Sequence, residues 1–172
     1  MSRYYIHYGD SDFDESKFIT IHNKSFGNKP IGGLWASPSD ADLSWKDWCD
    51  REEFKEYKEG DYFKFKLKDN ARILEIKNKK DVDNLPKLDE GFDLSIINIA
   101  SIDFEELAKD YDAMIVWMYK DNSPAMFESM YYLMYGWDCD SVLVFNKEMI
   151  EVIDNVNEWR FMWWFWFYWR RL

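Results

Sequence analysis

Apolar residues in this chain occur in short runs separated by charged segments, and most runs have the length and aromatic or β-branched content of strands. The runs at 112–118 and 141–145 are apolar at nearly every position, which predicts strands buried in the core. In chain order, the predicted strands are residues 3–8, 34–36, 62–67, 71–76, 112–118 and 141–145.

The segments between these strands contain residues typical of turns and helix caps. An Asp-Asn pair at 69–70 is typical of a turn, so we expect strands 62–67 and 71–76 to form a β-hairpin. A Ser-Asp pair at 39–40 can cap a helix over roughly 41–57. The other helical segments that we expect are 103–109, 127–135, 147–153 and a single turn within the charged loop 77–90.

Residues 9–30 are polar and contain two glycines and a proline, which predicts a long loop. A loop of this length is either functional or argues against the assignment. Gly32 and Gly33 then let the backbone turn sharply into the strand at 34–36.

A chain of 172 residues is long enough to form one domain with a sizeable core. Strands mixed with short helices around one core predict an α+β fold. We expect this domain to span residues 1–153 and an aromatic-rich tail to follow at 154–172.

The tail differs from the rest of the chain in its density of aromatic residues between arginines. Residues 159–171 are too few for a membrane-spanning helix, which needs about 20 apolar residues. They suit contact with a membrane surface; the alternatives are burial in the domain, contact within an oligomer, and an extension foreign to the native protein. Half of the chain's ten tryptophans lie here: Trp159, Trp163, Trp164, Trp166 and Trp169.

The formal net charge of −11 disfavours binding to DNA or RNA backbones, which requires a basic face. One explanation of the acidity is a solvated surface. The other is a non-enzymatic binding or inhibitor protein, of the phage or mobile-element type, that is steered to a basic partner surface.

Cys49 and Cys139 lack the spacing of a zinc or redox pair, so we expect buried thiols, with a disulfide as the alternative. No signal-peptide pattern opens the chain, and a cytoplasmic location is therefore the expectation.

His7 is the first candidate for chemistry, because it stands on an apolar strand with Tyr8 and Gly9 directly after it. Its imidazole can donate a hydrogen bond to a ribose hydroxyl; the alternative is a core histidine that is satisfied by a backbone carbonyl. Ser37 can orient a catalytic acid or bind ribose, and otherwise it is a turn or cap residue. The flat faces that can stack on a planar ligand, or else pack in the core, belong to Trp35, Trp45 and Trp48.

Three late carboxylates, Glu128, Asp138 and Asp140, can bond a ribose hydroxyl and stabilise a cationic transition state. The alternative for Asp138 and Asp140 is a pair of turn acids before a strand. Two isolated histidines predict no metal site. The chain has no Gly-x-Gly-x-x-Gly, Walker A or Gly-x-Ser-x-Gly motif, so Rossmann, P-loop and hydrolase sites are unsupported.

Three short segments carry a family resemblance. Residues 5–9 read Tyr-Ile-His-Tyr-Gly, residues 33–37 read Gly-Leu-Trp-Ala-Ser, and residues 135–144 read Tyr-Gly-Trp-Asp-Cys-Asp-Ser-Val-Leu-Val. They resemble the His-Gly strand, the Gly-Ile-Tyr-Phe-Ala/Ser strand and the late Gly-Tyr-Asp-Ser-Val-Val-Val strand of ADP-ribosyltransferases. The branch that they resemble is that of diphtheria toxin and poly-ADP-ribose polymerase, which has bacterial and phage members. The resemblance covers most of residues 3–150 in order.

The resemblance implies a compact α+β domain with split mixed and antiparallel sheets, which binds NAD as a substrate and needs no metal. It implies transfer of ADP-ribose to a macromolecule, for which we expect a protein target. His7 would hold a ribose, aromatic rings the nicotinamide, and a late acid the transition state. The chain departs from the family at Trp35, where a tyrosine is usual, and at the final glutamate, which Asp138 or Asp140 would replace. A non-catalytic member of the family is the alternative.

Overall fold

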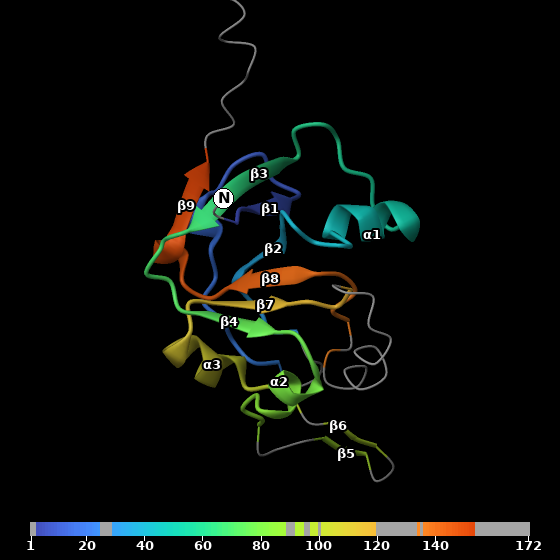
Figure 1. Ribbon diagram of the computed structural model, residues 1–172, viewed down its shortest axis with the longest axis vertical. Helices are drawn as coiled ribbons and strands as arrows, with labels where there is room; N and C mark the ends of the chain where they lie inside the picture. Colours follow the sequence, from blue (N-terminus) through green and yellow to red (C-terminus); the bar gives the residue numbers. More distant parts are fainter. Residues whose placement is uncertain are drawn as a thin grey trace, which may run out of the picture.

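The computed structural model describes residues 3–24, 29–88, 92–94, 97–99, 101–119, 134 and 136–153 (Figure 1). The elements in chain order are β1 (Tyr5–Tyr8), η1 (Glu15–Lys17), β2 (Leu34–Pro38), α1 (Trp45–Arg51), β3 (Tyr62–Leu67), β4 (Ile73–Ile76), α2 (Lys79–Asp83), β5 (Phe92–Leu94), β6 (Ile97–Ile99), α3 (Phe104–Asp110), β7 (Ala113–Val116), β8 (Ser141–Val144), η3 (Lys147–Met149) and β9 (Ile150–Ile153). The predicted tail at 154–172 lies outside the described residues, as does the predicted helix at 127–135 apart from Met134.

Within the described part of the chain, a seven-stranded sheet has the order β4-β7-β8-β2-β1-β3-β9, and β5 pairs separately with β6. β4 runs parallel to β7, and the other neighbours in the large sheet are antiparallel. The predicted α+β class is therefore confirmed. The large sheet is continuous rather than split, because β2 pairs with strands on both of its sides.

β2 joins the two halves of the sheet with different parts of its length. Its first three residues, 34–36, pair with β8, whereas Ser37 and Pro38 pair with β1. The ladder between β1 and β2 comprises Tyr5 with Pro38 and Ile6 with Ser37. Consequently the end of β1, at His7 and beyond, lies beside β2 without a backbone ladder between them.

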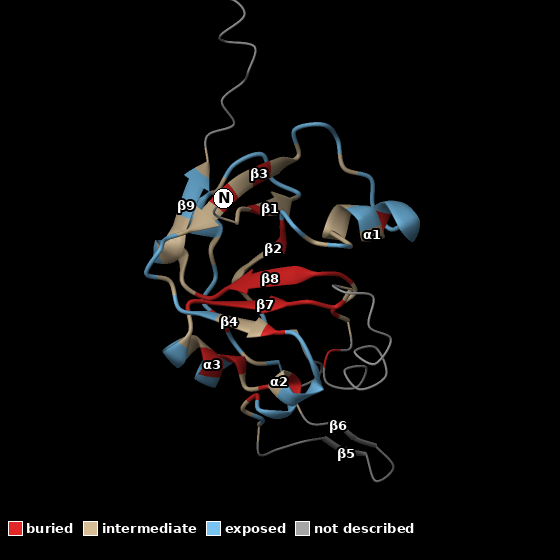
Figure 2. Ribbon diagram, viewed as in Figure 1, coloured by how far each residue is buried: buried red, intermediate tan, exposed pale blue. Residues whose placement is uncertain are grey.

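The core is centred on β7 and β8, every residue of which is buried (Figure 2). Helix α3 adds Phe104 and Leu107 to the same apolar cluster. Strand β3 instead alternates, with Phe63 and Phe65 buried and the lysine between them half-exposed. The continuous and alternating apolar patterns of the sequence thus correspond to strands covered on two faces and on one face, respectively.

A tight turn at Gly32 and Gly33 folds the long loop back onto the sheet. Both residues have positive φ, +84° and +69°. A Cβ on Gly32 would lie 2.3 Å from the Thr20 carbonyl oxygen, and one on Gly33 would lie 2.6 Å from a Leu143 methyl carbon. Only glycine allows this close approach of the loop to the strand.

The predicted hairpin is wrong. The chain does turn at 68–71, but β4 pairs in parallel with β7 rather than returning along β3. Both edges of β3 are already occupied, by β1 and by β9. The start of β4 is instead held beside β7 by two hydrogen bonds. The Arg72 backbone N–H donates to the Asp112 carboxylate at 2.9 Å, and the Asp112 N–H donates to the Arg72 carbonyl at 2.8 Å.

Two helix predictions also need correction. Residues 147–153 form only one 3-10 turn, and Ile150–Ile153 then add strand β9 to the free edge of β3. The helix predicted at 41–57 is limited to α1, which Ser44 caps together with Asp47 in a capping box. Helix α1 begins at Trp45 because Ser44 has extended backbone dihedrals, φ −80° and ψ 168°, while the N–H groups at 42 and 43 donate to the Asp140 carboxylate.

Candidate functional site

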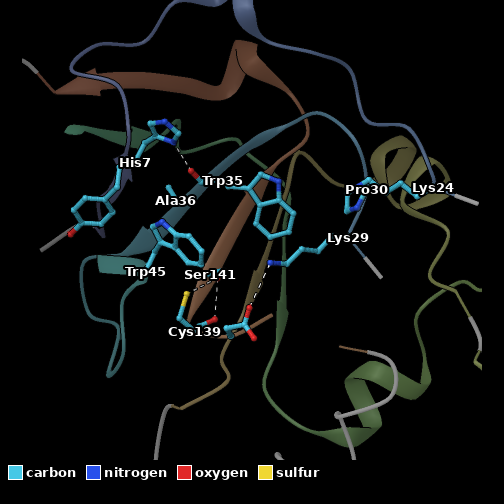
Figure 3. Close-up of a pocket in the computed structure, with 11 residues that line it drawn as sticks. His7, Lys24, Lys29, Pro30, Trp35, Ala36, Trp45, Cys139 and Ser141 are labelled. Carbon is cyan, nitrogen blue, oxygen red and sulfur yellow. Dashed lines mark hydrogen bonds and ion pairs between the residues drawn. The ribbon is translucent and has the colours of Figure 1, made fainter. Parts of the chain in front are cut away.

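A pocket of about 320 Å³ lies where β1, β2, α1 and the segment that leads into β8 meet (Figure 3). This volume lies at the lower end of the range for small-molecule sites, about 300–1,000 Å³. The pocket is lined by His7, Tyr8, Lys24, Lys29, Pro30, Trp35, Ala36, Trp45, Asp138, Cys139 and Ser141. It thus brings together five of the residues that the sequence singles out: His7, Tyr8, Trp35, Trp45 and Asp138.

The His7 ring spans the gap between β1 and β2. Its Nδ1 lies 2.7 Å from the Trp35 carbonyl oxygen (Figure 3). Because a carbonyl only accepts, Nδ1 carries a proton and donates to it. The bond to a backbone carbonyl agrees with the alternative interpretation of His7, whereas the ribose contact stays a prediction for a ring that lines the pocket.

A carboxylate lies on the other side of the His7 ring. The Nε2 atom is 3.5 Å from Oδ2 of Asp10, and Lys17 Nζ is 3.3 Å from Oδ1 of the same residue. The hydrogen bond from Lys17 is the main reason that the pKa of Asp10 is lowered. Asp10 consequently stays ionised at neutral pH beside the imidazole.

Two tryptophans form aromatic walls of the pocket. Trp45 stacks on Trp48 with a centroid distance of 5.0 Å and an interplanar angle of 16°, and its indole N–H donates to the Tyr57 hydroxyl. Trp35 packs against Trp137, with ring centroids 4.7 Å apart. Trp48 supports the Trp45 ring from behind and is not itself part of the lining.

The charged lining residues are Lys24, Lys29 and Asp138. Lys29 Nζ lies 3.9 Å from Oδ2 of Asp138 and 5.4 Å from the centroid of the Trp35 ring. The pocket thus holds more positive than negative side chains in a chain whose net charge is −11. A local excess of cations favours an anionic ligand.

Ser37 lies beneath the site rather than in its lining. Its side chain is fully buried, and its hydroxyl accepts a hydrogen bond of 2.8 Å from the backbone N–H of Trp45. Ser37 therefore fixes the first residue of α1, and through it the pocket-lining indole. This bond corresponds to the capping alternative in the sequence interpretation.

Asp140 is also fully buried and does not line the pocket. Its Oδ1 accepts from the backbone N–H of Tyr119 at 2.8 Å. Its Oδ2 accepts from those of Asp42 and Leu43 at 2.9 and 3.4 Å. With both oxygens occupied by backbone donors, this carboxylate fastens the approach to α1 onto the core.

Gly9, another predicted site residue, does not line the pocket. It follows β1 with a φ of +123°, and its N–H donates to the carbonyl of Asp61. Glu128 lies outside the described residues.

Cys139 and Ser141 form part of the lining that sequence reasoning missed. Burial raises the pKa of the Cys139 thiol to about 11, so the sulfur stays protonated and is a poor nucleophile. The Ser141 hydroxyl donates to the Cys139 carbonyl at 3.0 Å. Both cysteines are free and buried. The other missed lining residues are Lys24, Lys29, Pro30 and Ala36.

No family model, curated protein or solved structure matches the chain. Among the residues that the structure describes, no group of three or more histidine, cysteine or acidic side chains is arranged to hold a metal ion. In that same part of the chain, no helix has the length and apolar character needed to cross a membrane.

Proposed function

We propose that this chain is an ADP-ribosyltransferase that cleaves NAD and transfers ADP-ribose to a protein. The observation that carries the proposal is the convergence of His7, Trp35, Trp45 and Asp138 on one pocket. These residues come from separate sequence segments. They supply a hydrogen-bonding ring, two flat apolar faces and an anion, the groups that a nicotinamide ribose requires.

Each group has a role that follows from its surroundings. The Nε2 atom of His7 is the ring nitrogen that contacts a ribose hydroxyl, because Nδ1 is already committed to the Trp35 carbonyl. The indoles of Trp35 and Trp45 pack against the nicotinamide ring. The Asp138 carboxylate, on the lining beside Lys29, stabilises positive charge that develops on the sugar.

In the proposed reaction, the bond between the nicotinamide nitrogen and C1′ of the ribose breaks, and the electron pair leaves with nicotinamide. The ribose becomes an oxocarbenium-like cation. A nucleophilic side chain of the target then forms a bond to C1′ and loses its proton to the solvent. The products are nicotinamide and an ADP-ribosylated target, and no oxidant or metal takes part.

The experiment is to incubate the full chain with NAD and a cell lysate, and to measure both nicotinamide release and labelled ADP-ribose on proteins. Asp138→Asn should reduce the rate by about 10²–10³-fold, as for loss of one transition-state electrostatic partner. The matched control is Asp83→Asn, which removes an exposed carboxylate on α2 and should retain the full rate.

Absence of nicotinamide release by folded protein would contradict the proposal. Stoichiometric capture of a basic protein without any change in its mass would then favour the acidic inhibitor instead.

A further inference from the structure

Lys29 has an unusual position for a lysine of an acidic protein, because its charged end lies inside the pocket (Figure 3). Its aliphatic stem runs past Gly136, where an added Cβ would lie 3.5 Å from Cε of the lysine. Its ammonium lies over the Trp35 ring and near the Asp138 carboxylate. The Lys29 side chain thus passes a glycine and ends over a tryptophan face.

The bond between Lys29 and Asp138 is easily exchanged. Its N–O distance of 3.9 Å is at the outer limit of an ion pair, and both side chains are 39% exposed. Pairs of this kind contribute little free energy. A phosphate group carries more charge and more acceptor oxygens than one carboxylate, so it competes well for the same ammonium.

We propose that Lys29 is the phosphate-binding residue of the pocket and that it changes partner when a phosphorylated nucleoside binds. Without ligand, the ammonium neutralises Asp138. When the ligand's phosphate takes the ammonium, the Asp138 carboxylate is left to interact with the adjoining ribose. This inference rests on the proposed function for the identity of the ribose, but the phosphate contact itself does not require catalysis.

Because of this exchange, the ligand's phosphate affects both binding and catalysis. It adds a charge-assisted contact to binding, and it frees the carboxylate that stabilises the sugar cation. A ligand with the same base and sugar but no phosphate should therefore bind more weakly and also react more slowly once bound.

The test compares nicotinamide mononucleotide with nicotinamide riboside, which differ by one phosphate, in binding to the full chain measured by calorimetry. The mononucleotide should bind about tenfold more tightly to the unmodified protein, the lower end of the value for one charge-assisted contact. Lys29→Gln should abolish this preference, and Lys29→Arg should retain most of it. The control Lys79→Gln, on α2 and paired with Asp83, should leave the preference unchanged.

A titration with inorganic pyrophosphate distinguishes a general anion site from a nucleotide site. Pyrophosphate binding that is weaker than mononucleotide binding supports the proposal. Equal binding of the mononucleotide and the riboside to the unmodified protein would overturn it. So would tight pyrophosphate binding that does not respond to Lys29→Gln.

The two proposals fail separately. A phosphate preference that depends on Lys29, without any NAD cleavage, would support the phosphate site and refute the transferase. NAD cleavage with the same KM and kcat in Lys29→Gln as in the unmodified protein would support the transferase and refute the role of Lys29.

Discussion

Replacement of Asp140 by alanine tests the assignment of the two neighbouring aspartates, because it removes a carboxylate that the structure places in the core and not in the pocket. The carboxylate is fully buried and accepts two good backbone hydrogen bonds, at 2.8 and 2.9 Å, and a longer one at 3.4 Å. A hydrogen bond to a charged group contributes roughly 1.5–3 kcal/mol, and alanine removes all three of these bonds at once. We therefore expect the free energy of unfolding to fall by about 3–5 kcal/mol.

The assay is urea denaturation followed by circular dichroism, with Asp138→Ala as the matched control. Asp138 has a weak, half-exposed ion pair, so its replacement should lower the free energy of unfolding by less than about 1 kcal/mol. If Asp140→Ala costs less than about 1 kcal/mol at an unchanged denaturant slope, the structural role of Asp140 is refuted. The same result would return Asp140 to consideration as a site residue.

Three further predictions concern the elements that hold the site. Gly33→Ala should cost about 2–4 kcal/mol in urea denaturation, because the new Cβ meets the core at a positive φ; an unchanged midpoint would contradict this. Ser37→Ala should cost about 1–2 kcal/mol and weaken ligand binding by releasing Trp45, which calorimetry would detect; unchanged stability and binding would argue against it. Burial tends to raise the pKa of Asp112, but bonds from Arg72 and other donors outweigh it and lower the pKa, so the stabilisation is present above about pH 4 and is lost as pH falls through the folded-state pKa. Asp112→Asn should consequently reduce stability at pH 7 and flatten its decline below about pH 4, and an unaltered pH profile would be inconsistent with the pair.

The sequence predicted most strand positions because burial leaves a direct record in apolar patterning. Strands β7 and β8 are apolar throughout, apart from the serine that opens β8, and the alternation in β3 matches its half-buried state. Strand pairing left no such record. Which strand lies beside β4 depends on which edges are free and on the Arg72–Asp112 contacts, and these are properties of the assembled sheet.

The site was predictable where a residue belonged to a recognisable strand or helix, as for His7, Trp35 and Trp45. Lys29 lies in a polar loop without periodicity, so only the folded turn shows that it reaches the pocket. Ser37 has a chemically suitable side chain, but its hydroxyl is occupied by the backbone at the start of α1. Residue type alone does not distinguish a side chain that faces a ligand from one that caps a helix.

The most direct test of the central claim, that the pocket binds the nicotinamide half of NAD, is a titration with a non-cleavable carbocyclic NAD analogue. The readout is the indole N–H resonances of full-length, nitrogen-15-labelled protein, assigned by single replacement of each tryptophan by phenylalanine. The resonances of Trp35 and Trp45 should shift with a common saturating curve, whereas that of Trp117, fully buried away from the lining, should stay in place. The claim would be contradicted if the analogue saturated the protein without shifting the Trp35 and Trp45 resonances, or if it did not bind at all.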